Sequence, residues 1–187
     1  MIPVLAIDPG LQGGLAKLNA SGALIAVHRM PHVKGSTGID WAVLFKLLQA
    51  NPTATVVLEQ QMPFAMLDER GKPRVMGSTG AMLENYGKLK LCVEWTIGRY
   101  VEVYPQAWQA EYRERTPRGK RAITPAETSD RNKANNARHM EIANALFPGA
   151  AGRFAKDWTF GTATAALIGL HYQSRLKRER MEAHATT

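Results

Sequence analysis

Residues 6–16 of the chain read AIDPGLQGGLA, an apolar stretch that ends on a carboxylate and turns through glycines towards a second apolar stretch. The apolar run at residues 4–7 predicts a strand that carries Asp8 to the edge of a sheet. The glycines that follow permit close approach of another backbone or of a metal ion. Because an Asp before Pro-Gly is also a common turn former, this stretch alone leaves a functional and a structural role for Asp8 open.

The pattern outside this stretch predicts a sheet with helices around it. Turn residues divide residues 3–28 into three short strands, which favours an antiparallel meander. Further strands are expected at 55–59 and 100–104, and helices at 39–49, 79–96, 133–146 and 161–180. A long exposed loop or hairpin is expected at 60–78, and a basic segment broken by prolines at 113–133.

This order of elements is the ribonuclease H layout, an α/β fold with a mixed five-stranded sheet flanked by helices. The sequence shows no repeat and no linker that would divide it. We therefore expect one ribonuclease-H-like domain over residues 1–180 and a flexible tail over 181–187.

The chain is basic, with 24 Lys and Arg against 16 Asp and Glu and a formal net charge of +8. Such an excess suits a nucleic acid partner, although a merely soluble basic protein has the same composition. The single Cys92 excludes an internal disulfide and fits a reducing compartment. Because signal-peptide, membrane-spanning and nucleotide-triphosphate patterns are missing, we expect a cytoplasmic protein with no membrane partner and no nucleotide cofactor.

A second apolar strand ends in the same way as the first, because residues 55–59 read TVVLE and carry Glu59 at their end. If the two strands pair, Asp8 and Glu59 meet at one end of the sheet and repel each other unless a cation lies between them. Hard oxygen ligands select Mg²⁺, for which Mn²⁺ can substitute, and these ions serve phosphoryl transfer. The alternative is that Glu59 is a solvated residue at the start of a loop.

Several short blocks occur in an order that resembles one known family. They are Ile7-Asp8-Pro9-Gly10 with Gly13-Gly14, LEQQMP at 58–63, Gly80 and Gly87, VYPQAW at 103–108, Lys133 followed by ANALFP at 143–148, and Lys156-Asp157 before ATAALI at 163–168. Each block is weak, but their shared order resembles the RuvC-type Holliday junction resolvases of the ribonuclease-H-like superfamily. The resemblance is strongest to the branch found in phages and chloroplasts.

The resemblance implies a crossover junction endodeoxyribonuclease that binds and nicks branched DNA such as Holliday junctions by two-metal phosphodiester hydrolysis. It also implies a homodimer that holds the junction, and a role in DNA recombination and repair in a bacterial or phage-infected cell. By the same resemblance, Asp8, Glu59 and Asp157 are catalytic residues and ligands of Mg²⁺.

Thr164 departs from the family pattern, because the fourth acid of the family falls on this residue when two residues are inserted after Asp157. A Thr hydroxyl brings no charge and binds a hard cation weakly. Glu84 or Glu141 could take its place, the natural protein could be impaired or work with fewer acids, or a substitution could have inactivated the chain. Two other functions therefore stay open: a catalytically impaired branched-DNA-binding protein, and a ribonuclease-H-like enzyme that acts on RNA–DNA hybrids.

Candidate DNA-binding residues come from two expected loops and from the family match. In chain order they are Phe64, Arg70, Lys72, Arg74, Arg118, Lys120, Arg121, Lys133 and Lys156. An apolar tip beside basic residues could wedge into the centre of a junction, or else pack under its loop or across a dimer interface. Trp108 reads as a core residue or a stacking platform, and the five histidines have no metal-ligand spacing.

Overall fold

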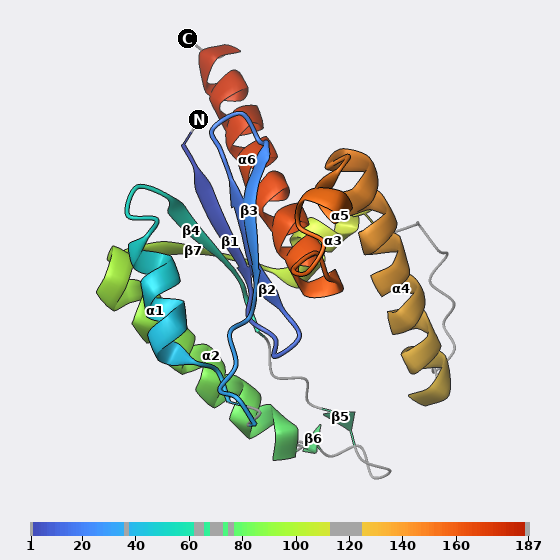
Figure 1. The fold of residues 1–187 in the computed structure, drawn as a ribbon. Coiled ribbons are helices and arrows are strands. Elements are labelled where there is room, and N and C mark those ends of the chain that lie inside the picture. Colours follow the sequence, from blue (N-terminus) through green and yellow to red (C-terminus); the bar gives the residue numbers. More distant parts are fainter. Residues whose placement is uncertain are drawn as a thin grey trace.

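A mixed sheet of five strands forms the centre of the structure, a computed structural model that describes residues 2–35, 38–61, 66–67, 73–74, 77–112 and 125–185 (Figure 1). The strands are β1 Val4–Asp8, β2 Gly14–Leu18, β3 Leu24–Arg29, β4 Thr55–Glu59 and β7 Tyr100–Val103, in the spatial order β3-β2-β1-β4-β7. The first three form an antiparallel meander, whereas β1, β4 and β7 run parallel to one another. The predicted α/β fold with a mixed five-stranded sheet is confirmed.

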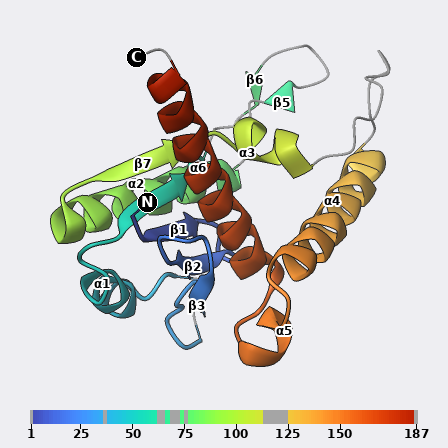
Figure 2. The same cartoon turned by 90° about the horizontal axis from the view of Figure 1, so that it is seen from above.

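Helices lie on both faces of the sheet (Figures 1 and 2). One face carries α1 Trp41–Gln49 and α2 Gly77–Ile97. The other carries α6 Phe160–Ala185, beside which lie α3 Pro105–Tyr112, α4 Pro125–Leu146 and α5 Ala150–Arg153. A separate hairpin joins β5 Met66–Leu67 to β6 Pro73–Arg74. No helix in the described part of the chain is long and apolar enough to cross a membrane.

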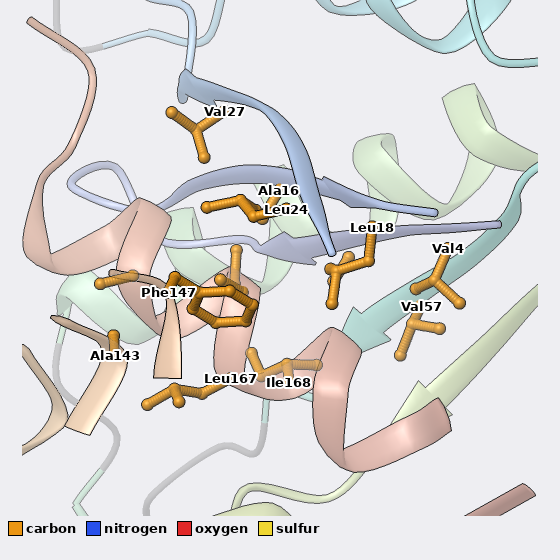
Figure 3. Close-up of a cluster of buried hydrophobic side chains, with 14 of the residues drawn as sticks. Val4, Ala16, Leu18, Leu24, Val27, Val57, Ala143, Phe147, Leu167 and Ile168 are labelled. Carbon is orange, nitrogen blue, oxygen red and sulfur yellow. The ribbon is translucent and has the colours of Figure 1, made fainter. Parts of the chain in front are cut away.

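Two hydrophobic cores lie on the two faces of the sheet. Between the sheet and α6, a cluster gathers Val4, Leu18 and Val57 of the strands with Ala143, Leu167 and Ile168 of the helices (Figure 3). On the opposite face, a second cluster gathers Leu5, Ile7, Val56 and Leu58 with Leu44, Leu48, Leu89 and Val93 of α1 and α2. Burial on both faces explains why residues 4–7 of β1 and residues 56–58 of β4 are continuous apolar runs.

The alternation of side chains decides which face receives the two strand-end acids. Ala6 of β1 and Val57 of β4 belong to the core against α6. Because side chains two residues apart share a face of a strand, Asp8 and Glu59 lie on the same face as these residues. A slip of one residue in either strand would turn its acid towards α1 and α2.

Four helices differ from the sequence-based prediction. Helices α3 and α5 were not predicted, and α4 begins at Pro125 rather than at residue 133. Helices α3 and α4 both start with a proline, which is favoured at the first helical position because the N–H that it lacks has no intrahelical acceptor there. Helix α6 continues to Ala185, so residues 181–185 extend it, and the predicted domain limits and flexible tail stay predictions.

Candidate functional site

Two carboxylates lie on neighbouring strands at the carboxyl end of the parallel pair in the centre of the sheet. Ile7 of β1 is paired with Leu58 of β4, so Asp8 and Glu59 are the next residues of the two strands. Their exposed fractions are 9% and 8%, which is low for charged side chains. The structure therefore brings the two predicted acids together in a buried position.

The glycine turn after Asp8 fixes the position of α6. A Cβ at Gly13 would lie 2.1 Å from the carbonyl oxygen of Asp8, and one at Gly161 would lie 2.1 Å from that of Gln12. Gly13 and Gly161 also form a β-bridge. The close approach that the glycines permit is therefore that of the first turn of α6 to the β1–β2 turn.

A pocket of about 240 Å³ is lined by both acids and by residues of three helices. The further lining residues are Trp108 and Gln109 of α3, Asn135, Asn136 and His139 of α4, and Phe160 and Thr164 of α6. Thr164 is 3% exposed, and its hydroxyl has no hydrogen-bond partner among the described residues. A buried hydroxyl of this kind is an oxygen donor for a ligand or a water in the pocket.

Trp108 connects Glu59 to an aromatic wall of the pocket. Its indole N–H donates to Oε1 of Glu59 at 2.9 Å. Its ring centroid lies 5.0 Å from that of His139, and His139 stacks on Phe160 with centroids 6.2 Å apart. The wall is therefore built from α3, α4 and α6, which are distant in sequence.

Burial makes the charged form of both acids unfavourable. Burial raises the pKa of Asp8 from 3.8 to about 6, opposed by a hydrogen bond from the backbone N–H of Gly10. Burial, together with the charge of Asp8, raises the pKa of Glu59 from 4.5 to about 8, opposed by the hydrogen bond from Trp108. A divalent cation between the two carboxylates would remove both the repulsion and part of the cost of burial.

The structure does not bring the predicted third acid, Asp157, to this pocket. Within the described residues, no group of three or more His, Cys, Asp or Glu is arranged to hold a metal ion. The hydroxyl of Thr162 accepts from the backbone N–H of Thr159 and donates to the carbonyl of Asp157, and these two bonds connect the first turn of α6 to the turn before it. With this turn, α6 presents Phe160 and Thr164 to the pocket instead.

The two acids considered as substitutes for the family's fourth acid also lie elsewhere. Glu84 is an exposed residue of α2 that forms an ion pair with Lys88, and Glu141 is an exposed residue of α4. Neither residue lines the pocket. Thr164, onto which the family match placed the missing acid, does line it.

Lys133 and Lys156 are the two candidate DNA-binding residues whose side chains the structure describes. Phe64, Arg70, Lys72, Arg118, Lys120 and Arg121 lie outside the described residues, and Arg74 belongs to β6 without a described side chain. Lys133 on α4 and Lys156 before α6 are both exposed. The Nζ atom of Lys133 lies 3.8 Å from Oδ1 of Asp130. DNA binding by all nine residues stays a prediction.

Sequence reasoning missed the polar residues that α4 contributes to the pocket. Asn135 and His139 are four residues apart and therefore share one helix face. This polar spacing was the available signal, because the five histidines show no metal-ligand spacing among themselves. Trp108 was assigned to the core or to stacking, and its hydrogen bond to Glu59 joins residues too distant in sequence for a local pattern to reveal.

Neither protein-family models nor curated proteins match the sequence. Among solved structures, the chain is similar to T. thermophilus RuvC in complex with a Holliday junction substrate, with 13% identity and a TM-score of 0.55. The similarity covers 91% of this chain and 92% of that one. The chain therefore has a RuvC-like α/β fold of the ribonuclease H type.

Proposed function

We propose that the chain is a metal-dependent endonuclease that binds and nicks branched DNA such as Holliday junctions. The observation that carries the proposal is the buried pair Asp8 and Glu59 in a polar pocket at the end of the central strands. The RuvC-like fold supports it, because the similar protein was solved with a Holliday junction substrate. Membership of the phage and chloroplast branch stays a prediction.

The residues of the pocket fit a divalent cation. The pocket provides hard oxygen donors of three kinds. They are two buried carboxylates that repel each other when both are charged, a buried hydroxyl on Thr164 without a hydrogen-bond partner among the described residues, and neutral amides. We assign Asp8 and Glu59 as ligands of Mg²⁺, with Mn²⁺ as a substitute. Such an ion supplies Lewis-acid activation of water and neutralises charge that develops on a phosphodiester.

Residues of this chain would hold the two carboxylates in place and bind the DNA. Asp8 is fixed by the hydrogen bond from Gly10, and Glu59 by the one from Trp108. Lys133 and Lys156 are exposed and would bind backbone phosphates. Hydrolysis with two ions remains a prediction, because Asp157, its expected third ligand, does not line the pocket.

The test is cleavage of a labelled synthetic four-way junction with Mg²⁺ or with EDTA. We expect nicks only with Mg²⁺, and we expect Asp8→Asn to abolish them while junction binding by fluorescence anisotropy is nearly unchanged, because the amide keeps the shape and loses the charge. Cleavage by Asp8→Asn at the parental rate would remove Asp8 from the mechanism. Cleavage of an RNA–DNA hybrid in preference to the junction would favour a ribonuclease H activity instead.

One observation favours the alternative of a catalytically impaired junction-binding protein. Thr164 stands in the pocket where a third carboxylate would complete a stronger metal site. In the same assay, this alternative predicts junction binding without cleavage at any Mg²⁺ or Mn²⁺ concentration.

A homodimer would place two such sites on one junction, and an apolar groove between α1 and α2 is a suitable surface for it. The groove is about 650 Å³ and is lined by Trp41, Ala42, Phe45, Lys88, Leu91, Cys92 and Trp95. Trp95 is 82% exposed and Leu91 is 53% exposed, which is unusual for apolar residues side by side on a surface. Light scattering should show a dimer that Trp95→Glu dissociates, and a monomeric parent protein would contradict this assignment.

A further inference from the structure

The hydrogen bond between Trp108 and Glu59 involves only one of the two carboxylate oxygens. The indole N–H of Trp108 donates to Oε1 at 2.9 Å, and no described residue is seen to donate to Oε2. Trp108 is 1% exposed and Glu59 is 8% exposed, so water does not readily compete for this bond. One oxygen of Glu59 is thus held by the protein, and the other is left for a ligand in the pocket.

The indole ring itself has little freedom to move. Its centroid lies 6.2 Å from that of Tyr112 and 5.0 Å from that of His139, with the rings tilted by 52° and 50°. His139 is in turn stacked on Phe160. A close-packed interior resists rotation of a large side chain, so the direction of the N–H, and with it the orientation of Glu59, is fixed before any ligand enters.

We infer that Trp108 is a positioning residue that keeps Glu59 a one-oxygen ligand and thereby makes the pocket prefer Mg²⁺ or Mn²⁺ to Ca²⁺. The inference rests on the proposed metal site. Ca²⁺ takes six to eight oxygens and commonly binds a Glu through both of them, whereas Mg²⁺ demands a near-octahedral set of oxygens at shorter distances. A Glu with one oxygen held by the protein therefore suits Mg²⁺ better than Ca²⁺.

The chain provides a matched control for this inference. Trp158 is also nearly buried, with 9% exposed, and its indole N–H donates to Oδ1 of Asn144 at 2.8 Å. Trp158 does not line the pocket. Trp158→Phe therefore removes an equivalent buried hydrogen bond and leaves Glu59 untouched, whereas Trp108→Phe removes the N–H and retains an aromatic ring.

The experiment measures dissociation constants of Mn²⁺ alone and of Ca²⁺ alone for the metal-free protein by isothermal titration calorimetry, without DNA. For Trp108→Phe we expect Mn²⁺ affinity to fall by about 10-fold, the lower end of what loss of a partner of a metal ligand costs. We expect Ca²⁺ affinity to fall much less or to rise, because Oε1 becomes available, so the preference for Mn²⁺ decreases. Trp158→Phe should leave both affinities and their ratio at the parental values.

Equal losses of affinity for both ions in Trp108→Phe would overturn the inference, since they would mean that Trp108 only supports the packing of the pocket. Unchanged affinities would overturn it as well. A different result would show that the proposed metal site itself is wrong. In that case the parental protein would bind neither ion, or Glu59→Gln would bind Mn²⁺ as tightly as the parent. If circular dichroism shows that Trp108→Phe does not fold, 3-benzothienylalanine at position 108 replaces the N–H by sulfur in a ring of the same shape.

Discussion

Replacement of Glu59 by Gln should stabilise the metal-free protein near neutral pH. The substitution keeps the length of the side chain and an oxygen that can accept from the indole N–H of Trp108. It removes a group that has to hold a proton in the folded protein near neutral pH, because burial and the charge of Asp8 raise the pKa of Glu59. A protein that gains stability when a strand-end carboxylate is neutralised holds that carboxylate for a purpose other than folding.

The magnitude follows from the pKa of Glu59, which burial and the charge of Asp8 raise from 4.5 to about 8. Between these values the folded protein holds a proton that the unfolded chain has lost, so stability falls as pH rises through this window. The interval from pH 4.5 to pH 7 is about 2.5 pH units, and at about 1.36 kcal/mol per unit Glu59 costs the folded state about 3 kcal/mol at pH 7. At pH 4 both states are protonated and the cost is close to zero.

The assay is urea unfolding with EDTA at pH 4 and pH 7, with the exposed Glu94 on α2 replaced by Gln as the control. We expect Glu59→Gln to exceed the parent by about 3 kcal/mol at pH 7 and to match it at pH 4, while Glu94→Gln changes little at either pH. Equal stability of Glu59→Gln and the parent at pH 7 would refute the reasoning. A gain of the same size at both pH values would refute it too, because the cost of Glu59 exists only at a pH where the unfolded chain has lost the proton that the folded protein holds.

Three further predictions concern the contact of Gly161 with the β1–β2 turn, the residue at position 164 and the net positive charge of the chain. Gly161→Ala should destabilise by about 1–3 kcal/mol in urea, because its Cβ would lie 2.1 Å from the carbonyl oxygen of Gln12, whereas Gly152→Ala has open space and should be nearly neutral. Thr164→Glu should speed junction cleavage and strengthen its Mg²⁺ dependence, at some cost in metal-free stability, and an unchanged rate across a Mg²⁺ titration would contradict this. Junction affinity should fall steeply between low and moderate salt, since several Lys and Arg displace counterions from phosphate, and a flat salt dependence would show that the charge of +8 serves another purpose.

The sequence was sufficient to predict the sheet and the pairing of its acids because both follow from local patterns. Short apolar runs, residues 4–7 and 56–58, that are each followed by an acid define β1 and β4, and turn residues define the meander. The alternation of side chains then decides the face on which Asp8 and Glu59 lie, with no knowledge of the helices required. The family match also placed Thr164 correctly at the pocket, since α6 is anchored there by Gly161.

The walls of the pocket were not predictable in the same way because they depend on contacts between distant elements. The starts of α3 and α4 were missed since a proline reads as a helix breaker unless it stands at the first helical position. Asp157 was expected in the pocket because the resemblance to the resolvase family implied it. In the structure, the hydroxyl of Thr162 donates to the carbonyl of Asp157, and Phe160 and Thr164 are the residues of this segment that line the pocket.

The charges around the pocket bear on how many ions it can hold. Asp8 and Glu59 together balance one divalent cation, and the other lining residues are amides, a hydroxyl, aromatic rings and an imidazole. A second ion would leave two positive charges without partners in a largely buried site, which is costly unless further negative charge arrives. The phosphates of DNA are the source of such charge that the proposed function supplies. If the proposed function requires two ions, the negative charge for the second would come from the phosphates of the DNA, because Thr164 contributes none to the pocket.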